Sequence, residues 1–117
     1  MTEIFVFGSN LAGIHGAGAA RFAVRRHGAM YGQGIGLQGR SYGIPTKDEQ
    51  IETLPLDDVA RHVETFKEFA RSRPDLTFYV TPIGCGLAGY KRPQIRPMFD
   101  GMPESCRFAE TWEDPDL

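Results

Sequence analysis

The sequence predicts an α/β fold with a mostly parallel central sheet flanked by helices. Strand-like apolar runs alternate along the chain with segments of helical spacing, as in strand, helix, strand units. Two of these runs, 4–7 and 76–81, are each followed by a glycine-rich turn, at 8–18 and 84–89. Alternation and paired glycine turns together favour a parallel α/β domain over an all-α or all-β one.

The first predicted unit is a strand, a glycine turn and a helix. Residues 4–7 form a continuous apolar run bounded by a glycine, which is typical of a strand buried on both faces. After the turn at 8–18, Phe22 and Ala23 belong to an apolar helical face, and the basic residues just before Gly28 suit a helix C-terminus.

The next segment predicts a loop and a second strand. Residues 29–39 hold four further glycines and no clear period, so we expect an irregular loop with a short strand near 30–31. Residues 41–46 predict a strand that runs into the polar loop 47–50. A proline near the end of that strand limits further ladder pairing.

The second half of the chain continues the alternation. Apolar residues recur with helical spacing from Leu56 to Ala70, acidic residues complement the start of this helix, and Pro74 closes it. The β-branched and aromatic run at 76–81 predicts the third strand. The remaining predicted elements are the second glycine turn at 84–89, a short helix at 93–99 and a last strand at 107–110.

Length and charge restrict the classes of function. A chain of 117 residues is one domain, assigned to 1–112, with an acidic C-terminal tail at 113–117. Function is then expected on the surface of this domain or at an interface between copies, which leaves a homo-oligomer open. A net charge of -2 and a pI near 5.9 give no general attraction to nucleic acid or to an anionic membrane.

Cysteine usage and hydropathy predict a cytoplasmic protein. Cys85 and Cys106 form neither a metal-ligand cluster nor a disulfide framework, and the N-terminus has no charged segment followed by a long apolar run. No apolar stretch approaches the length that spans a membrane. We therefore expect reduced thiols, no metal, no bound cofactor and no membrane partner.

The glycine turns predict a phosphate-binding crevice. Strand, crossover helix, strand units are right-handed, so the carboxyl ends of the first and third strands meet at one sheet edge, where ligands of open α/β sheets bind. The two turns then face each other, and the positive N-terminal end of the helix after Gly16 points into the crevice. Two facing rows of main-chain N–H donors best match a diphosphate.

Two segments resemble the macro domain family, which binds ADP-ribose. Residues 6–20, Val-Phe-Gly-Ser-Asn-Leu-Ala-Gly-Ile-His-Gly-Ala-Gly-Ala-Ala, are similar to the family segment in which a strand ends in Asn-Ala-Ala-Asn before a glycine-rich loop and helix. Asn10 takes the place of the second asparagine. Residues 81–90, Thr-Pro-Ile-Gly-Cys-Gly-Leu-Ala-Gly-Tyr, resemble the second family loop, and the order of the pieces agrees from Ile4 to about Glu110.

This resemblance implies a compact, three-layer macro-like fold that binds ADP-ribose or a related NAD-derived nucleotide. The two loops would wrap the diphosphate, Asn10 would meet the distal ribose, and Tyr90 would pack against that ribose. The ligand-binding residues so implied are Gly8, Ser9, Asn10, Gly13, Gly16, Ala17, Gly18, Ile83, Gly84, Cys85, Gly86, Leu87, Ala88, Gly89 and Tyr90.

The sequence also departs from the family pattern. Phe7 replaces the first asparagine, and the first loop carries neither the acidic residue of de-ADP-ribosylating members nor the paired glutamates of poly-ADP-ribose glycohydrolases. The aspartate with which the family binds the adenine amino group also has no counterpart in the sequence. The base must therefore be recognised in another way, or the ligand is not adenine-based.

Several candidate residues have a structural alternative. The glycines could serve tight turns and close packing, and Asn10 could cap the turn after it. His15 could act as an acid or a base; the alternative is that it is an exposed loop histidine without a catalytic role. Cys85 is a candidate nucleophile, against a small buried thiol.

Two segments outside the glycine turns are weighed in the same way. Residues 47–49, Lys-Asp-Glu, could contact phosphate or supply an acid or base, against a solvated turn. The middle loop could close over the ligand as a lid, or it could be a plain connection between elements. The residues of such a lid would be Tyr31, Gln33, Gln38 and Arg40.

Two other functions stay open beside nucleotide binding. The first is a hydrolase acting on an ADP-ribose derivative or an ADP-ribosylated group, with water activated by substrate phosphate or by His15. The second is another Rossmann-like nucleotide-binding or signal-sensing domain. The latter usually carries a Pro-Gly-Gly-x-Gly-Thr run, which does not occur here.

Overall fold

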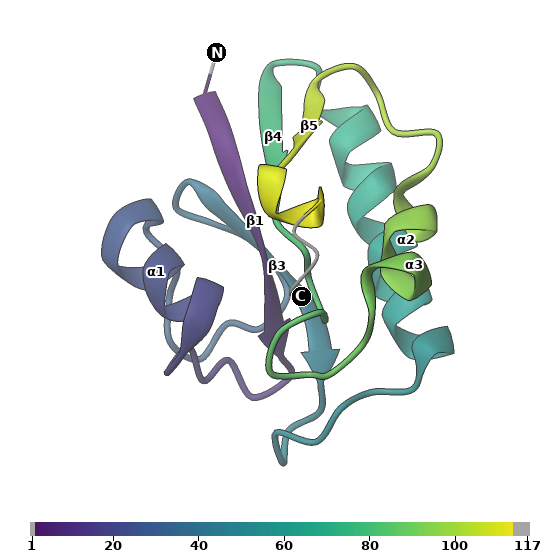
Figure 1. Ribbon diagram of the computed structural model, residues 1–117. Coiled ribbons are helices and arrows are strands. Elements are labelled where there is room, and N and C mark those ends of the chain that lie inside the picture. Colours follow the sequence, from purple (N-terminus) through teal and green to yellow (C-terminus); the bar gives the residue numbers. More distant parts are fainter. Residues whose placement is uncertain (1, 114–117) are drawn as a thin grey trace.

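The computed structural model describes residues 2–113, which form a mixed, mostly parallel sheet of five strands in the order β2-β3-β1-β4-β5 (Figure 1). The central strand β1 pairs in parallel with β3 and β4, β4 pairs in parallel with β5, and the edge strand β2 is antiparallel to β3. The strands are β1 (Thr2–Asn10), β2 (Gly36–Gln38), β3 (Ser41–Lys47), β4 (Leu76–Val80) and β5 (Cys106–Phe108). The predicted mostly parallel α/β architecture is confirmed.

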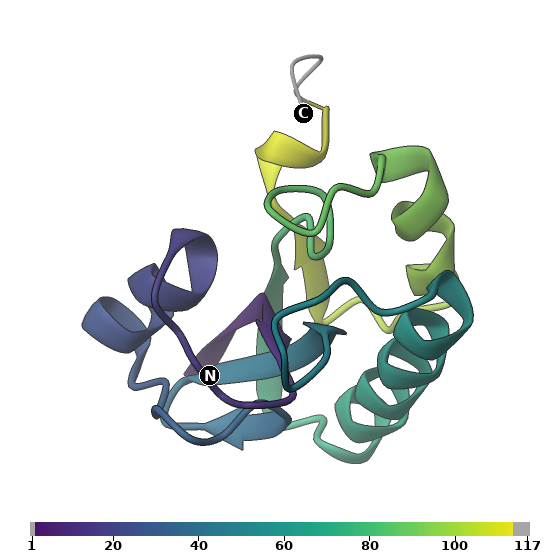
Figure 2. The same ribbon diagram turned by 90° about the horizontal axis from the view of Figure 1, so that it is seen from below.

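Helices lie on both sides of this sheet (Figures 1 and 2). They are α1 (Gly18–His27), α2 (Leu56–Ser72) and α3 (Arg92–Ile95); the 3-10 turn η1 (Arg96–Phe99) follows α3, and η2 (Glu110–Glu113) follows β5. None of the helices in the described part of the chain combines the length and hydropathy needed to cross a bilayer.

The alternation of side chains along β1 explains how the two sides differ. Phe5 and Phe7 belong to a small apolar cluster with α1, in which Ala20 and Ala23 let the helix approach closely. The other face of β1, with Ile4 and Val6, joins the main core, to which α2 contributes Val59, Val63 and Phe66. β1 is therefore covered on both faces along most of its length, up to its carboxyl end.

Two strand predictions need correction. The predicted strand at 30–31 is wrong: Met30 and Tyr31 are 54% and 62% exposed, and the strand lies at 36–38. Gln38 is buried and lies opposite Ser41 in the β2–β3 ladder, so the strand forms around it at 36–38. The Gln38 side-chain oxygen accepts the Met30 N–H at 2.8 Å, which holds residue 30 outside the sheet.

The last strand spans 106–108 rather than 107–110. At Ala109 the chain leaves the sheet for η2, where the Trp112 indole N–H donates to the Val80 carbonyl at 2.8 Å. Of the predicted acidic tail, Glu113 closes η2, and 114–117 lie outside the described residues.

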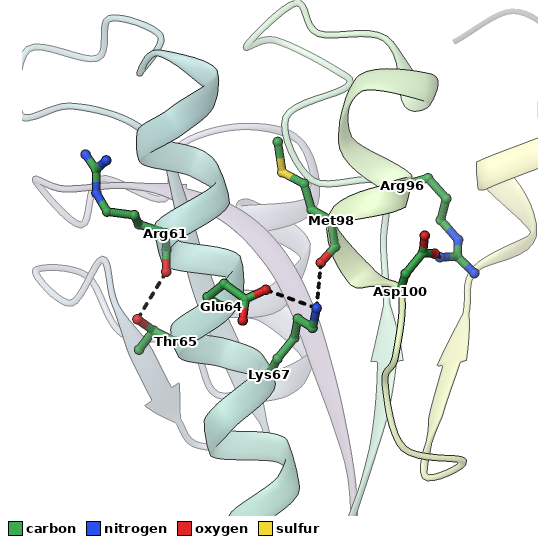
Figure 3. A network of polar contacts seen from close by, with 7 residues as sticks. All are labelled: Arg61, Glu64, Thr65, Lys67, Arg96, Met98 and Asp100. Atoms are coloured by element: carbon green, nitrogen blue, oxygen red, sulfur yellow. Dashed lines mark hydrogen bonds and ion pairs between the residues drawn. The ribbon is translucent and has the colours of Figure 1, made fainter.

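A buried lysine joins α2 to η1 (Figure 3). The Lys67 ammonium donates to the Met98 carbonyl at 3.1 Å and pairs with Glu64 at 3.1 Å, although the lysine residue itself is 7% exposed. Both bonds satisfy a cation that is otherwise costly to bury. The contact fixes the segment that follows the second glycine turn against the long helix.

Candidate functional site

Three loops meet at the carboxyl edge of β1, β3 and β4, the edge that Figure 2 faces. The N–H of Leu11, in the first glycine turn, donates to the Lys47 carbonyl at 2.9 Å, and the Thr53 hydroxyl donates to the Ala88 carbonyl of the second turn at 2.9 Å. A cavity of about 470 Å³ lies between the loops. Its lining is formed by Gly8, Ser9, Asn10, Ile14, Gly16, Ala17, Gly18, Ala19, Ala20, Thr46, Lys47, Ile51, Thr81, Pro82, Ile83, Gly84, Gly86, Leu87 and Ala88.

The first glycine turn is shaped by its own side chains. The Asn10 amide group donates to the Ile14 carbonyl at 2.7 Å, and its oxygen accepts the Ile14 N–H at 2.9 Å. Gly13 adopts a φ of +72°, and a Cβ there would lie 2.4 Å from the Gly32 carbonyl carbon. Asn10 thus caps the turn, and Gly13 serves close packing of two loops.

The N-terminus of α1 opens on the cavity. Ala17 is the N-cap residue, no side chain caps the helix, and its first turn carries no acidic residue. Gly18, Ala19 and Ala20, the first residues of the helix, line the cavity. N–H groups at this end of an α-helix have no intrahelical acceptor, so they carry the positive end of the helix dipole into the cavity.

The second glycine turn presents a further row of N–H groups. It is closed by bonds from the Gly89 N–H to the Gly86 carbonyl at 3.0 Å and from the Tyr90 N–H to the Gly84 carbonyl at 2.9 Å. Within the described chain, the N–H groups of Gly86, Leu87 and Ala88 make no hydrogen bond. These donors border the same cavity as the start of α1.

The third wall is formed by the end of β3 and the loop 48–54 after it. The Asp48 carboxylate accepts the N–H groups of Gln50 and Glu52 at 2.9 and 3.0 Å, and the Asp48 N–H donates to the Glu52 carbonyl at 2.8 Å. Lys47 is the one charged residue among the described residues that line the cavity. The local field therefore favours an anion.

Most of the residues predicted to bind ligand lie in this lining. The two turns come together as the parallel sheet required, and Gly8 lets them touch, because a Cβ there would lie 3.3 Å from the Gly84 nitrogen. The predicted residues found in the lining are Gly8, Ser9, Asn10, Gly16, Ala17, Gly18, Ile83, Gly84, Gly86, Leu87 and Ala88. The predicted residues outside the lining are Gly13, His15, Cys85, Gly89 and Tyr90.

His15 is fully buried beside the first turn. Its Nε2 lies 2.9 Å from the Gln33 carbonyl, so this nitrogen carries a proton that it donates, and the ring packs edge-on to Phe7 with centroids 5.2 Å apart. Its Nδ1 has no hydrogen-bond partner in the described chain. The histidine is therefore neither an exposed loop residue nor part of the cavity wall.

Cys85 and Tyr90 point into the protein. Burial raises the pKa of the Cys85 thiol to about 11, so the thiol stays protonated near neutral pH, and its Sγ lies 3.4 Å from the Ile83 carbonyl. Cys85 is therefore a small buried thiol and not an activated nucleophile. The Tyr90 hydroxyl donates to the Leu54 carbonyl, and its ring packs against the main core.

Of the segments predicted as a lid or as a charged contact, one residue lines the cavity and the others do not. Lys47 reaches the cavity, whereas Asp48 and Glu49 lie outside its lining. Residues 31–40 also lie outside it and contact the first turn, where the Tyr31 hydroxyl donates to the His15 carbonyl at 2.9 Å.

Sequence reasoning missed several wall residues. Thr46, Thr81 and Pro82 were placed in strands or motifs but not in the site, although each lies at the carboxyl end of a strand, which is a usable signal. Ala19 and Ala20 lie in the wall because they belong to the first turn of α1, which borders the cavity. The apolar residues Ile14 and Ile51 carry no sequence signal of a ligand.

Comparison of the chain with protein-family models, with curated proteins and with solved structures finds no match.

Proposed function

We propose that this protein binds ADP-ribose or a related NAD-derived nucleotide in the cavity between its two glycine turns. The observation that carries the proposal is that two sets of N–H groups without a hydrogen-bond partner in the described chain border one cavity, at the uncapped start of α1 and at Gly86, Leu87 and Ala88. Donors of this kind bind the oxygens of phosphate groups. Two sets of donors in the wall of one cavity suit two linked phosphates.

Size and charge support the same ligand class. A cavity of about 470 Å³ falls in the range that encloses a molecule the size of a nucleotide. Lys47 supplies a positive charge at its wall, and no carboxylate of the described residues lines it to repel a diphosphate. Because the protein as a whole carries a net charge of -2, the attraction of an anionic ligand comes from this local positive charge.

The lining favours binding over hydrolysis. Among the described residues, no aspartate, glutamate, histidine or cysteine lines the cavity, so Lys47 is the one side chain there of a type used in general acid or base catalysis. His15 is held apart by burial and by its bond to Gln33. We therefore assign the role of a binding module.

The arrangement of helices supports a three-layer, macro-like assignment of the fold. α1 packs against one side of the sheet and α2 against the other, with the glycine turns at the carboxyl edge between them (Figure 2). This layering is the one that the resemblance of the two glycine segments to macro domains implies.

Alanine substitutions at two glycines test the site. A Cβ at Gly16 or at Gly86 meets no atom within 4 Å, and neither glycine needs a positive φ, so Gly16→Ala and Gly86→Ala should keep the fold and fill ligand space. By isothermal titration we expect one ADP-ribose per parent chain and an affinity loss of about tenfold or more in each variant.

Gly101→Ala is the matched control. A Cβ at Gly101 also meets no atom within 4 Å, but its φ of +82° strains any other residue, and it lies outside the cavity. This variant should lose stability, by about 1 kcal/mol, and keep its affinity. Equal ADP-ribose affinity in the parent and in both cavity variants would refute the proposed site.

Turnover separates binding from hydrolysis. Release of free ADP-ribose from an ADP-ribosylated protein is measured over hours with the parent and with His15→Ala. We expect no release above buffer from either protein. Release by the parent that disappears in His15→Ala would establish the hydrolase instead.

A further inference from the structure

We infer that the cavity holds the base of its nucleotide by apolar contact alone and accepts purine and pyrimidine nucleoside diphosphate sugars alike. The inference rests on the proposed function and extends its ligand class from ADP-ribose to ribosyl diphosphates of any common base. It depends on three properties of the wall: its polar side chains, its exposed apolar side chains and the backbone of one of them.

The uncharged polar side chains of the wall are already engaged with the main chain. The hydroxyl of Ser9 donates to the Gly34 carbonyl, that of Thr46 donates to the Ser9 carbonyl at 3.3 Å, and that of Thr81 donates to the Val6 carbonyl at 2.6 Å. Asn10 bonds Ile14 with its oxygen and with one of its two amide N–H donors. The hydroxyl protons and the Asn10 oxygen are therefore committed before a ligand enters, and selective reading of a base edge needs such groups to be free.

Apolar side chains in the same wall remain exposed. Ile14 is 52%, Ile51 39% and Leu87 74% exposed, and each comes from a different one of the three loops around the cavity. A planar base offers an apolar face to such side chains whatever its edge groups are, because every base has a π-face. These residues therefore provide contact without selection.

The backbone at Ile51 indicates that this contact is built in. Ile51 has a φ of +63°, a conformation that β-branched residues rarely adopt, and it is the one such non-glycine residue in the described chain. The bonds of Asp48 to its neighbours, together with the Thr53 to Ala88 bond, hold it there. Strain of this kind persists where surrounding structure enforces it, most often at ligand sites.

The test compares ADP-ribose, GDP-ribose and CDP-ribose, which differ in the base alone, by isothermal titration with the full chain. We expect the three affinities to lie within about tenfold of one another, because aliphatic side chains contact the face of a base and not its edge groups. A preference above tenfold for one base would overturn the inference, and if ADP-ribose still binds, the proposed function stands. Absence of ADP-ribose binding would overturn the proposed function and this inference with it.

Ile51→Gly tests the wall itself. Glycine accepts the left-handed backbone, so the unfolding midpoint in urea should not fall, whereas affinity for all three ligands should fall by about tenfold with the lost apolar contact. Ile35→Gly is the control, because Ile35 is 47% exposed outside the cavity, and its affinities should match the parent. Unchanged affinities in Ile51→Gly, or a loss for one base alone, would contradict the inference.

Discussion

Lys47 is the residue on which the charge of the proposed site depends. It is the last residue of β3, and its carbonyl accepts the Leu11 N–H at 2.9 Å, so its position is fixed relative to the first glycine turn. A single ammonium group at the wall can neutralise part of a diphosphate.

We predict that Lys47→Gln weakens ADP-ribose binding by about tenfold, the effect of one lost hydrogen bond to a charged group. It should also flatten the decline of affinity with salt, because fewer charges are then screened. Titrations at 50 and 300 mM salt measure both effects. Lys91→Gln removes the same charge outside the cavity and should leave affinity unchanged; an equal loss in both variants would show that net charge, not position, matters.

Cys85 gives a prediction about stability at alkaline pH. Burial raises the pKa of its thiol to about 11, against about 8.5 for an unfolded thiol. The native state thus holds this proton more tightly, and the contribution to stability is complete below pH 8.5 and is lost as the pH rises toward about 11.

Urea unfolding of the parent and of Cys85→Ala measures this loss. Between pH 8 and pH 10.5, we expect the parent's free energy of unfolding to fall more steeply than that of the variant, since other groups titrate equally in both. Parallel pH profiles would mean that the thiol is not buried as described.

At the scale of single residues, sequence reasoning found the glycines better than the side chains. Glycine turns after apolar strands follow from local pattern, and Gly16, Gly84 and Gly86 do line the cavity. The burial of His15 depends on contacts with Phe7 and Gln33, the latter eighteen positions away, which no local pattern specifies. The position of Ile51 in the cavity wall could not be predicted for the same reason, because it depends on the hydrogen bonds with which Asp48 folds the loop.

At the scale of elements, α2 and η1 are coupled through Lys67 (Figure 3). This coupling positions the chain between the second glycine turn and β5 against the long helix. We predict that Lys67→Met lowers the free energy of unfolding by about 1–2 kcal/mol, because the Met98 carbonyl loses its donor.

Arg61→Met is the control for this effect. Arg61 also pairs with a carboxylate on α2, that of Asp58, but its side chain is 70% exposed, and such pairs contribute less than about 1 kcal/mol. Chemical denaturation of the two variants compares them. A loss in Lys67→Met no larger than in Arg61→Met would show that the buried contact adds no stability.

Element prediction succeeded where a pattern was strong and failed where pairing was non-local. The helix predicted from Leu56 to Ala70 is observed as Leu56–Ser72, since its apolar spacing is regular over four turns. β2 was missed because three residues with a glycine carry little strand propensity. Its place is set by pairing with β3 and by buried Gln38, neither of which is a local signal.

At the scale of the whole molecule, topology accounts for the site. β1 lies between β3 and β4 and runs parallel to both, so the turns after β1 and β4 and the loop after β3 emerge at one edge. The parallel arrangement, and with it the meeting of the two turns, could be predicted from the alternation of elements. The start of the third loop, at 47–49, could also be proposed from its place after a strand, but the apolar contribution of Ile51 could not, because it depends on side-chain placement across the edge.

The central claim is that both glycine turns bind one diphosphate ligand, and amide NMR tests it most directly. On titration of the labelled protein with ADP-ribose, we expect the largest N–H shifts at 16–20 and 86–88, moving together with one dissociation constant. A hollow bordered by Arg26, His27 and Arg40 serves as an internal reference, and its N–H signals should stay in place. Absence of shifts, or shifts confined to one turn or to that hollow, would contradict the claim.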